Sequence, residues 1–146
     1  MANKNIIFIG ILFSLTIISG CSNNSTGGAV IDSRQSQISI LVLDSDGALS
    51  AEECSARDLN DKVMMLESQY CGHCKATLPV FKEACLEKGI EPIIIDVSDK
   101  EQRKQMESYG LDIMYTPTFV FGCKHTIGTR SKQEYLQLLD KFLKGN

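Results

Sequence analysis

The sequence predicts an α/β domain with a central mixed sheet of four to five strands flanked by helices. Short apolar runs rich in β-branched residues alternate along the chain with segments whose apolar residues recur at helical spacing. Towards the end, the runs Thr118 to Phe121 and His125 to Ile127 flank the tight turn Gly122-Cys123-Lys124, which indicates an antiparallel hairpin. Alternating elements favour parallel strands and the hairpin adds antiparallel ones, so a mixed sheet is expected.

The first three elements follow from local signals. Ile38 to Leu43 alternates and is rich in β-branched residues, which predicts a strand. Ser50 with Glu53 three residues later is a capping-box pattern, and it predicts a short helix that reaches about Leu59. Lys62 to Glu67 is predicted to be a largely buried strand.

The second helix is predicted from Cys74 to Glu87. One apolar face of this segment is formed by Cys74, Leu78, Phe81 and Cys85. Pro79 is expected to kink the helix, and Gly89 is expected to end it. The continuous apolar run within Pro92 to Val97 predicts a strand in a central parallel position.

Two further helices complete the domain. Ser98 and Glu101 are predicted to cap a helix that reaches about Tyr109. Another capping box, Ser131 with Glu134, opens the last helix. Its expected buried stripe consists of Tyr135, Leu138, Leu139 and Phe142.

The stretch Cys71-Gly72-His73-Cys74 lies between the second strand and the second helix. A thiol at a helix N-terminus is close to free backbone N–H groups, which stabilise the reactive thiolate. A second thiol three residues later can close a disulfide on the first, so Cys71 and Cys74 are predicted to be a redox-active pair. Half of a zinc site is the alternative, but no second ligand pair follows at zinc-ligand spacing. A c-type haem site requires His where this chain has Lys75, so no metal and no cofactor are expected.

The N-terminus carries an export signal. Lys4 precedes the apolar run Ile6 to Ile18, which is too short to span a membrane comfortably. The run ends in Ile18-Ser19-Gly20-Cys21, which resembles the lipobox of prokaryotic lipoproteins. By that resemblance residues 1–20 are a lipoprotein signal peptide, and Cys21 carries a diacylglycerol that anchors the domain on the extracytoplasmic side of the cell membrane. A plain secretory signal or an uncleaved anchor is the alternative.

Residues 21–37 are rich in Ser, Asn, Gly and Gln and are predicted to be a flexible tether, although Ala29 to Ile31 could open the first strand. The domain is therefore expected over residues 38–146. The chain of 146 residues has a net charge of -3 and no basic run, so nucleic acid is not an expected partner. A monomer is expected.

The order of elements, with Cys-x-x-Cys after the second strand, resembles the thioredoxin fold over most of Ile38 to Lys144. Pro79 lies where thioredoxins keep a kinking proline, and Gly128 before the last helix also fits. Pro117 lies where the family has a cis-proline facing the active-site cysteines. The Gly-His pair between the cysteines is similar to that of protein disulfide isomerase domains.

Two positions depart from the family pattern. Thioredoxins and disulfide isomerases carry a buried acid six residues before the first cysteine, and here that position is Met65. Glu67 is the nearest carboxylate in sequence and could move protons for Cys74, but it could equally face outward. The usual Trp before the first cysteine is Tyr70.

The resemblance implies a role for each site residue. Cys71 is the nucleophile, and Cys74 resolves the mixed disulfide. His73 can carry positive charge beside the Cys71 thiolate, which would make the disulfide more oxidising. Pro117, if cis, would present the Thr116 backbone to an extended substrate segment.

Three cysteines remain. Cys85 lies on the apolar face of the second helix and is most simply a small buried side chain. A Cys54–Cys123 disulfide is one possible pairing, and Cys85–Cys123 is another.

The predicted function is a membrane-tethered thiol-disulfide oxidoreductase that oxidises or isomerises disulfides of exported proteins, with a membrane or exported redox partner. The alternatives are a thiol reductase of exported proteins or apocytochromes, and a thioredoxin-like binding module without catalytic turnover. The Gly-His pair favours oxidation or isomerisation, whereas net reduction would need a membrane electron donor.

Overall fold

The computed structural model describes residues 38–145, so the predictions on the leader, Cys21 and the tether lie outside the described residues. The helices are α1 (Ala51–Ala56), α2 (Gly72–Glu87), α3 (Lys100–Ser108) and α4 (Lys132–Gly145). The strands are β1 (Leu41–Leu43), β2 (Gly47–Ala48), β3 (Val63–Glu67), β4 (Ile93–Asp96), β5 (Leu111–Ile113), β6 (Thr118–Phe121) and β7 (Lys124–Ile127).

The main sheet has five strands in the order β2-β7-β6-β3-β4. β3 and β4 are parallel, whereas β3–β6, β6–β7 and β7–β2 are antiparallel. β1 and β5 form a separate parallel pair. This mixed sheet, with α2 following β3 and a hairpin leading to the last helix, confirms the predicted thioredoxin fold.

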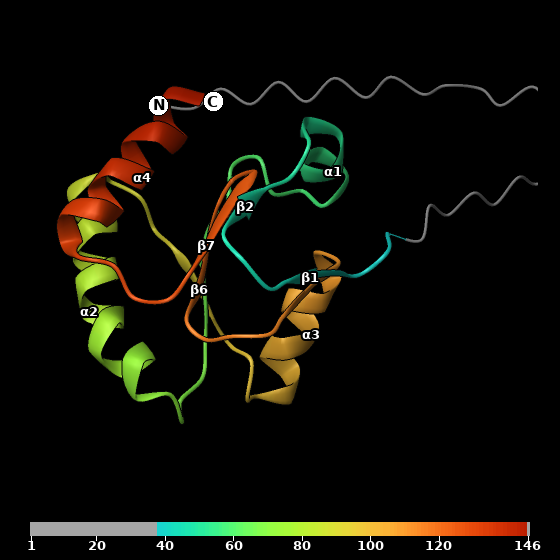
Figure 1. Cartoon of the computed structure of the whole chain (residues 1–146), viewed down its shortest axis with the longest axis horizontal. Helices are drawn as coiled ribbons and strands as arrows, with labels where there is room; N and C mark the ends of the chain where they lie inside the picture. The colour runs from blue at the N-terminus through green and yellow to red at the C-terminus, as the bar shows by residue number, and fades with distance from the viewer. Residues whose placement is uncertain (1–37, 146) are drawn as a thin grey trace, which may run out of the picture. The chain divides into compact units, whose positions relative to one another are not determined.

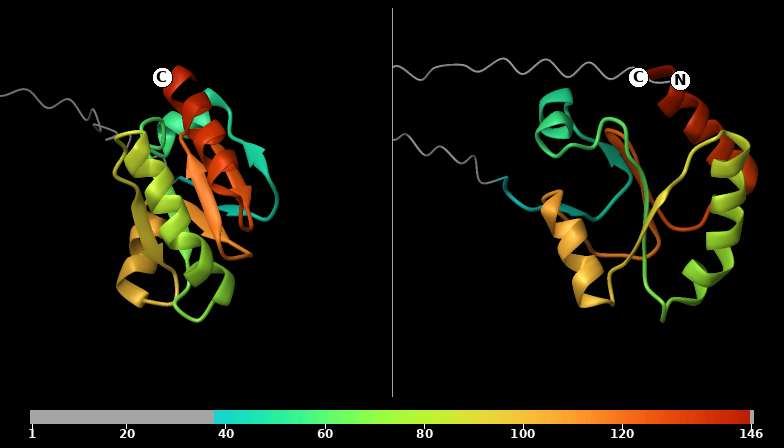
Figure 2. Two further views of the ribbon diagram at one scale, coloured as in Figure 1. Left: turned by 90° about the vertical axis from the view of Figure 1, so that its left-hand side faces the viewer. Right: turned by 180° about the vertical axis from the view of Figure 1, so that it is seen from behind.

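The helices cover both faces of the sheet. Figure 1 shows α2 and α4 on one side and α1 and α3 on the other, and the reverse view in Figure 2 shows the same layers. Side chains of β3 alternate between the two faces: Met65 belongs to the core beside α2 and α4, and Met64 and Leu66 belong to the other core. The first core contains packed aromatic rings, among them Phe81, Phe119 and Tyr135.

The predicted helices are present, and both predicted capping boxes at α1 and α4 form. The Glu53 N–H donates to Ser50 Oγ at 3.2 Å, and the Ser50 N–H donates to the Glu53 carboxylate at 3.1 Å. The predicted cap of α3 is wrong, however. Asp99 caps this helix by accepting from the N–H groups of residues 101 and 102, both at 2.9 Å. Ser98 instead binds the Asp96 carboxylate of β4.

Three strand predictions also need correction. The first strand begins at Leu41 rather than Ile38. β2 and β5 were not predicted, because elements of two or three residues carry almost no periodic signal. β4 is parallel to β3 as expected, but it lies at the edge of the sheet and not in a central position. Within residues 38–145, no helix combines the length and apolar character needed to cross a membrane.

Candidate active site

Cys71 and Cys74 lie together at the start of α2. Cys71 is the N-cap of this helix, and the backbone N–H of Cys74 donates to Cys71 Sγ at 3.2 Å. The Cys71 N–H donates to the carbonyl of Ser68 at 2.9 Å, which fixes the loop that leads from β3. Cys71 is half-buried, and Cys74 is fully buried. The Cys71 sulfur is therefore accessible to another molecule, whereas the Cys74 sulfur is not.

The two thiols have opposite pKa shifts. Burial raises the pKa of Cys71, but hydrogen bonds from the Cys74 side chain and from the backbone N–H groups of Cys74 and His73 outweigh it, so the pKa lies below its ordinary value. Burial and the hydrogen bond to Cys71 raise the pKa of Cys74 to about 11. The lowered pKa favours the thiolate form of Cys71, whereas Cys74 keeps its proton to higher pH.

The loop before β6 faces the first thiol. The Thr116–Pro117 peptide bond is cis, as predicted. The Cys71 thiol donates to the carbonyl oxygen of Thr116 at 3.5 Å, so the two segments, which are far apart in sequence, meet at Cys71. Pro117 is buried and Thr116 is half-buried.

His73 and Tyr70 flank the dithiol on the surface. His73 is exposed in the first turn of α2, one residue before Cys74. Tyr70 is 82% exposed, and Met114 and Tyr115 on the facing loop are 61% and 54% exposed. Large exposed apolar side chains at a reactive thiol offer a contact surface for another chain. Met114 and Tyr115 were missed by sequence reasoning, because exposure at that loop depends on tertiary structure.

Met65 occupies the position of the missing acid. Its side chain is fully buried in the same core as Cys74, and it pairs across the sheet with Phe119 and Ile94. The structure therefore places an apolar thioether, and no carboxyl group, at position 65 of this core.

Glu67 is half-buried at the end of β3. The sequence left open whether it faces inward or outward, and strand alternation favours the inward face. Val63 and Met65 contact the core beside α2, so Glu67 continues the same face. Burial raises the pKa of Glu67, the Asp96 carboxylate raises it further, and the Lys75 ammonium opposes the shift. Asp96 was missed by sequence reasoning, although a carboxylate that ends an apolar parallel strand is a recognisable signal.

The remaining cysteines lie away from the dithiol. Cys54 and Cys123 form a disulfide, so the alternative Cys85–Cys123 pairing is wrong. Cys85 is a free thiol of α2 that is buried in the core beside the sheet, and burial raises its pKa to about 12. Burial and the raised pKa both disfavour the thiolate form of Cys85 in the folded protein.

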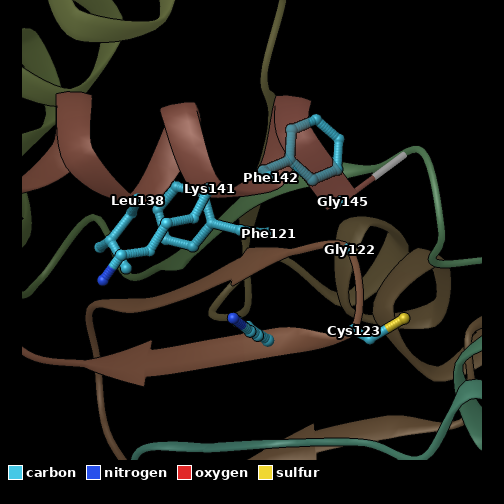
Figure 3. Close-up of a pocket in the computed structure, with 8 residues that line it drawn as sticks. Phe121, Gly122, Cys123, Leu138, Lys141, Phe142 and Gly145 are labelled. Carbon is cyan, nitrogen blue, oxygen red and sulfur yellow. The ribbon is translucent and has the colours of Figure 1, made fainter.

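A small pocket of about 140 Å³ lies between α4 and the β6–β7 turn. Figure 3 shows Phe121, Leu138 and Phe142 at this pocket, with Cys123 beside it. None of its lining residues belongs to the dithiol, so this pocket is not the reactive site.

Comparison with known proteins finds solved structures that are similar to this chain, but it finds no matching family of sequences. No family model matches the sequence, and no curated protein matches it. Chloroplastic thioredoxin z is 15% identical with a TM-score of 0.45, and the match covers 73% of this chain and 96% of that chain. Oxidised thioredoxin from Plasmodium falciparum is 21% identical with a TM-score of 0.43, covering 71% of this chain and 98% of that chain. Reduced thioredoxin from Schistosoma mansoni is 26% identical with a TM-score of 0.38, at the same coverage of 71% and 98%.

Proposed function

We propose that this protein is a thiol-disulfide oxidoreductase that exchanges electrons with protein clients through Cys71 and Cys74. One observation carries the proposal. A half-exposed thiol with a lowered pKa caps a helix, and a buried thiol with a raised pKa lies three residues later in contact with it. This asymmetry matches the two roles in disulfide exchange, in which one sulfur attacks and the other resolves.

In the reducing direction, the exchange takes place in two steps. The Cys71 thiolate attacks one sulfur of a client disulfide, and the other client sulfur leaves as a thiolate that takes up a proton. Cys74 then loses its proton to solvent and attacks Cys71 Sγ, which forms the Cys71–Cys74 bond and releases the second client sulfur as a thiolate that takes up a proton. The client has gained two electrons, and the dithiol has lost two. The same steps in reverse oxidise a client dithiol.

We place this chemistry outside the cytoplasm. The lipobox-like sequence before Cys21 supports an exported, lipid-anchored protein, and disulfides persist in that environment. The Cys54–Cys123 disulfide agrees with such a location. Clients are then exported proteins near the membrane, and electrons pass to or from a membrane or exported redox partner.

The net direction is proposed to be oxidation or isomerisation. A positive charge on His73 beside the Cys71 thiolate would stabilise the dithiol form and make the disulfide a better oxidant. The alternative is net reduction of exported proteins or apocytochromes. A reduction potential measured against glutathione separates the two, because a strongly reducing value would reject the oxidising direction.

Client capture tests the function in the host. A Cys74→Ser variant retains the nucleophile but cannot resolve the mixed disulfide, so clients should remain bound to Cys71 and be released by dithiothreitol. The matched control is Cys71→Ser/Cys74→Ser, which should capture nothing. If the single variant captures no more protein than this control, and the wild-type protein neither reduces insulin nor refolds ribonuclease, the alternative of a binding module without turnover would replace the enzyme.

A further inference from the structure

Most of the large apolar side chains that are exposed within residues 38–145 lie on one path across the surface. Two of the exposed side chains, Leu86 and Leu143, belong to α2 and α4. The others form a set that we call the apolar stripe, which consists of Ile38, Ile40, Val42, Met114, Tyr115 and Tyr70.

Strand register makes the stripe continuous from β1 to the loop after β5. Leu41 and Leu43 of β1 contact the core beside α1 and α3. The alternate residues Ile40 and Val42 therefore point to the opposite, outward face. The Met114 N–H donates to the Leu43 carbonyl at 3.2 Å, which continues the pairing of β1 with β5. Met114 is thus a diagonal neighbour of Val42 on the outward face.

The far end of the stripe lies at the dithiol. Met114 comes two residues before Thr116, whose carbonyl oxygen is 3.5 Å from Cys71 Sγ. Tyr70 directly precedes Cys71. A client that is joined to Cys71 by a mixed disulfide therefore has its own chain beside this end of the stripe.

The strand β1 also has an open edge. Within residues 38–145 it pairs with β5 alone. The Leu41 N–H donates to the Gly110 carbonyl at 2.8 Å, so the backbone groups of the alternate residues Ile40 and Val42 point away from β5. Such an edge can pair with an extended chain, and alternate side chains of that chain would then lie beside the stripe.

Two carboxylates on the outward face favour a protein segment over lipid as the occupant. Asp112 lies beside Val42 in the register, and Asp44 follows Val42 by two residues. Asp112 pairs with Arg103 of α3 at 3.0 Å, whereas the exposed Asp44 forms no ion pair within residues 38–145. Negative charge here opposes docking on anionic lipid, and it favours an apolar segment that includes a basic residue.

We propose that the apolar stripe is a docking site for protein clients in an extended, unfolded conformation, which add as a strand to the open edge of β1 while their cysteine reacts with Cys71. The inference rests on the proposed exchange function and names its substrate class. The client supplies alternating apolar side chains and a basic residue near Asp44. A small disulfide such as oxidised glutathione reaches Cys71 without contacting β1.

Reaction rates with two disulfides test this docking. One is oxidised glutathione, and the other is a disulfide-linked dimer of a short peptide that alternates valine with threonine and contains one cysteine and one lysine. Each is mixed with reduced protein, and mass spectrometry follows closure of the Cys71–Cys74 disulfide. Ile40→Ser/Val42→Ser should slow the peptide reaction by about tenfold and change the glutathione reaction by less than about twofold.

The matched control is Leu86→Ser/Leu143→Ser. These two side chains are 79% and 47% exposed, against 61% and 47% for Ile40 and Val42, so the control removes similar apolar groups outside the stripe. Both of its rates should match those of the wild-type protein.

Methylation of the peptide backbone tests the strand addition itself. One peptide carries N-methyl groups at its odd positions, and a second carries them at its even positions. Because the bond to Cys71 fixes which peptide edge faces β1, only one of the two should lose its rate advantage over glutathione. Equal rates for the two peptides would contradict strand addition.

The outcomes separate the docking from the exchange chemistry. If Ile40→Ser/Val42→Ser reacts with the peptide as fast as the wild-type protein does, the docking is wrong and the exchange function stands. Weaker binding of that variant to phosphatidylglycerol vesicles, or loss of a dimer in sedimentation, would then assign the stripe to lipid or to a second copy. If both rates fall together, the substitutions act on the dithiol and the docking is also rejected. If the wild-type protein reacts with neither disulfide, the exchange function is rejected, and this inference is rejected with it.

Discussion

The reactivity of the dithiol is set by single residues at the start of α2. The Cys71 sulfur accepts a backbone N–H at the helix N-terminus, and its thiolate is favoured because the orphan amides there have no other partner. Cys74 lies in the core, where the charged form is costly. The spacing of three residues therefore separates a thiol whose thiolate is favoured from a thiol that keeps its proton, within one helical turn.

Alkylation kinetics test this difference. The rate of reaction of Cys71 with iodoacetamide should rise with pH and level off at lower pH than for glutathione, because its pKa lies below the ordinary value. Cys85 should remain unmodified in the folded protein, since it is buried and its pKa is about 12. Peptide mass spectrometry of the reduced protein between pH 4 and pH 10 gives both rates. Equal labelling of these two cysteines would contradict the assignment of the nucleophile.

A carboxyl group at position 65 should destabilise this core. Met65→Glu buries an acid that has no polar partner, so its folded pKa is raised above the unfolded value of about 4.3. The part of the loss that comes from ionisation is therefore absent below the unfolded pKa and complete above the folded pKa. Urea unfolding should show a cost that is larger at pH 8 than at pH 4 by about 3 kcal/mol.

The control for this substitution is Met65→Leu, which conserves volume and should cost less than about 1.5 kcal/mol at both pH values. A cost for Met65→Glu that does not depend on pH would show that the glutamate ionises as readily in the folded protein as in the unfolded one, and that the position is not the closed apolar site described above.

At the scale of elements, the Cys54–Cys123 disulfide joins α1 to the β6–β7 turn. Backbone hydrogen bonds reinforce this junction, because the Leu49 N–H donates to the Cys123 carbonyl at 2.7 Å. The turn lies at the end of the sheet where Phe121 pairs with Val63, the first residue of β3. The dithiol follows the other end of that strand, so the crosslink and the reactive site are at opposite ends of the sheet.

Removing the crosslink should therefore affect stability and leave the reactive site unchanged. The two cysteines are separated by 69 residues, and closing a loop of that length typically contributes about 2–4 kcal/mol. Cys54→Ala/Cys123→Ala should lose stability by this amount in urea unfolding, with an unchanged alkylation rate at Cys71. A large fall in that rate in the folded variant would mean that the disulfide supports the active site.

At the scale of the whole molecule, the architecture was predictable because most elements carry their own local signals. Capping boxes, apolar periodicity and the spacing of Cys71 and Cys74 identified the α/β class and the dithiol. Features that depend on pairing between distant segments were not predictable. They include the edge position of β4, the choice of Cys54 as the partner of Cys123, and the face on which Glu67 lies.

The membrane tether is a prediction for the full chain. Cys21→Ser removes the thiol that would carry the lipid, so the protein should lose incorporation of labelled fatty acid and move from the membrane to the soluble exported fraction. Cys85→Ser serves as the matched control, because it removes a buried thiol and should leave both properties unchanged. Two results together would contradict a lipid anchor. The Cys21→Ser variant would stay on the membrane, and the wild-type protein would incorporate no labelled fatty acid.

A redox titration shows whether Cys71 and Cys74 exchange disulfides. The protein is equilibrated across a series of glutathione ratios, free thiols are alkylated, and mass spectrometry assigns each cysteine. We expect one reversible two-electron transition in which only these two residues change, while Cys54–Cys123 stays closed and Cys85 stays free. A pair that remains a dithiol at every ratio, or that binds glutathione without closing a disulfide, would contradict the account.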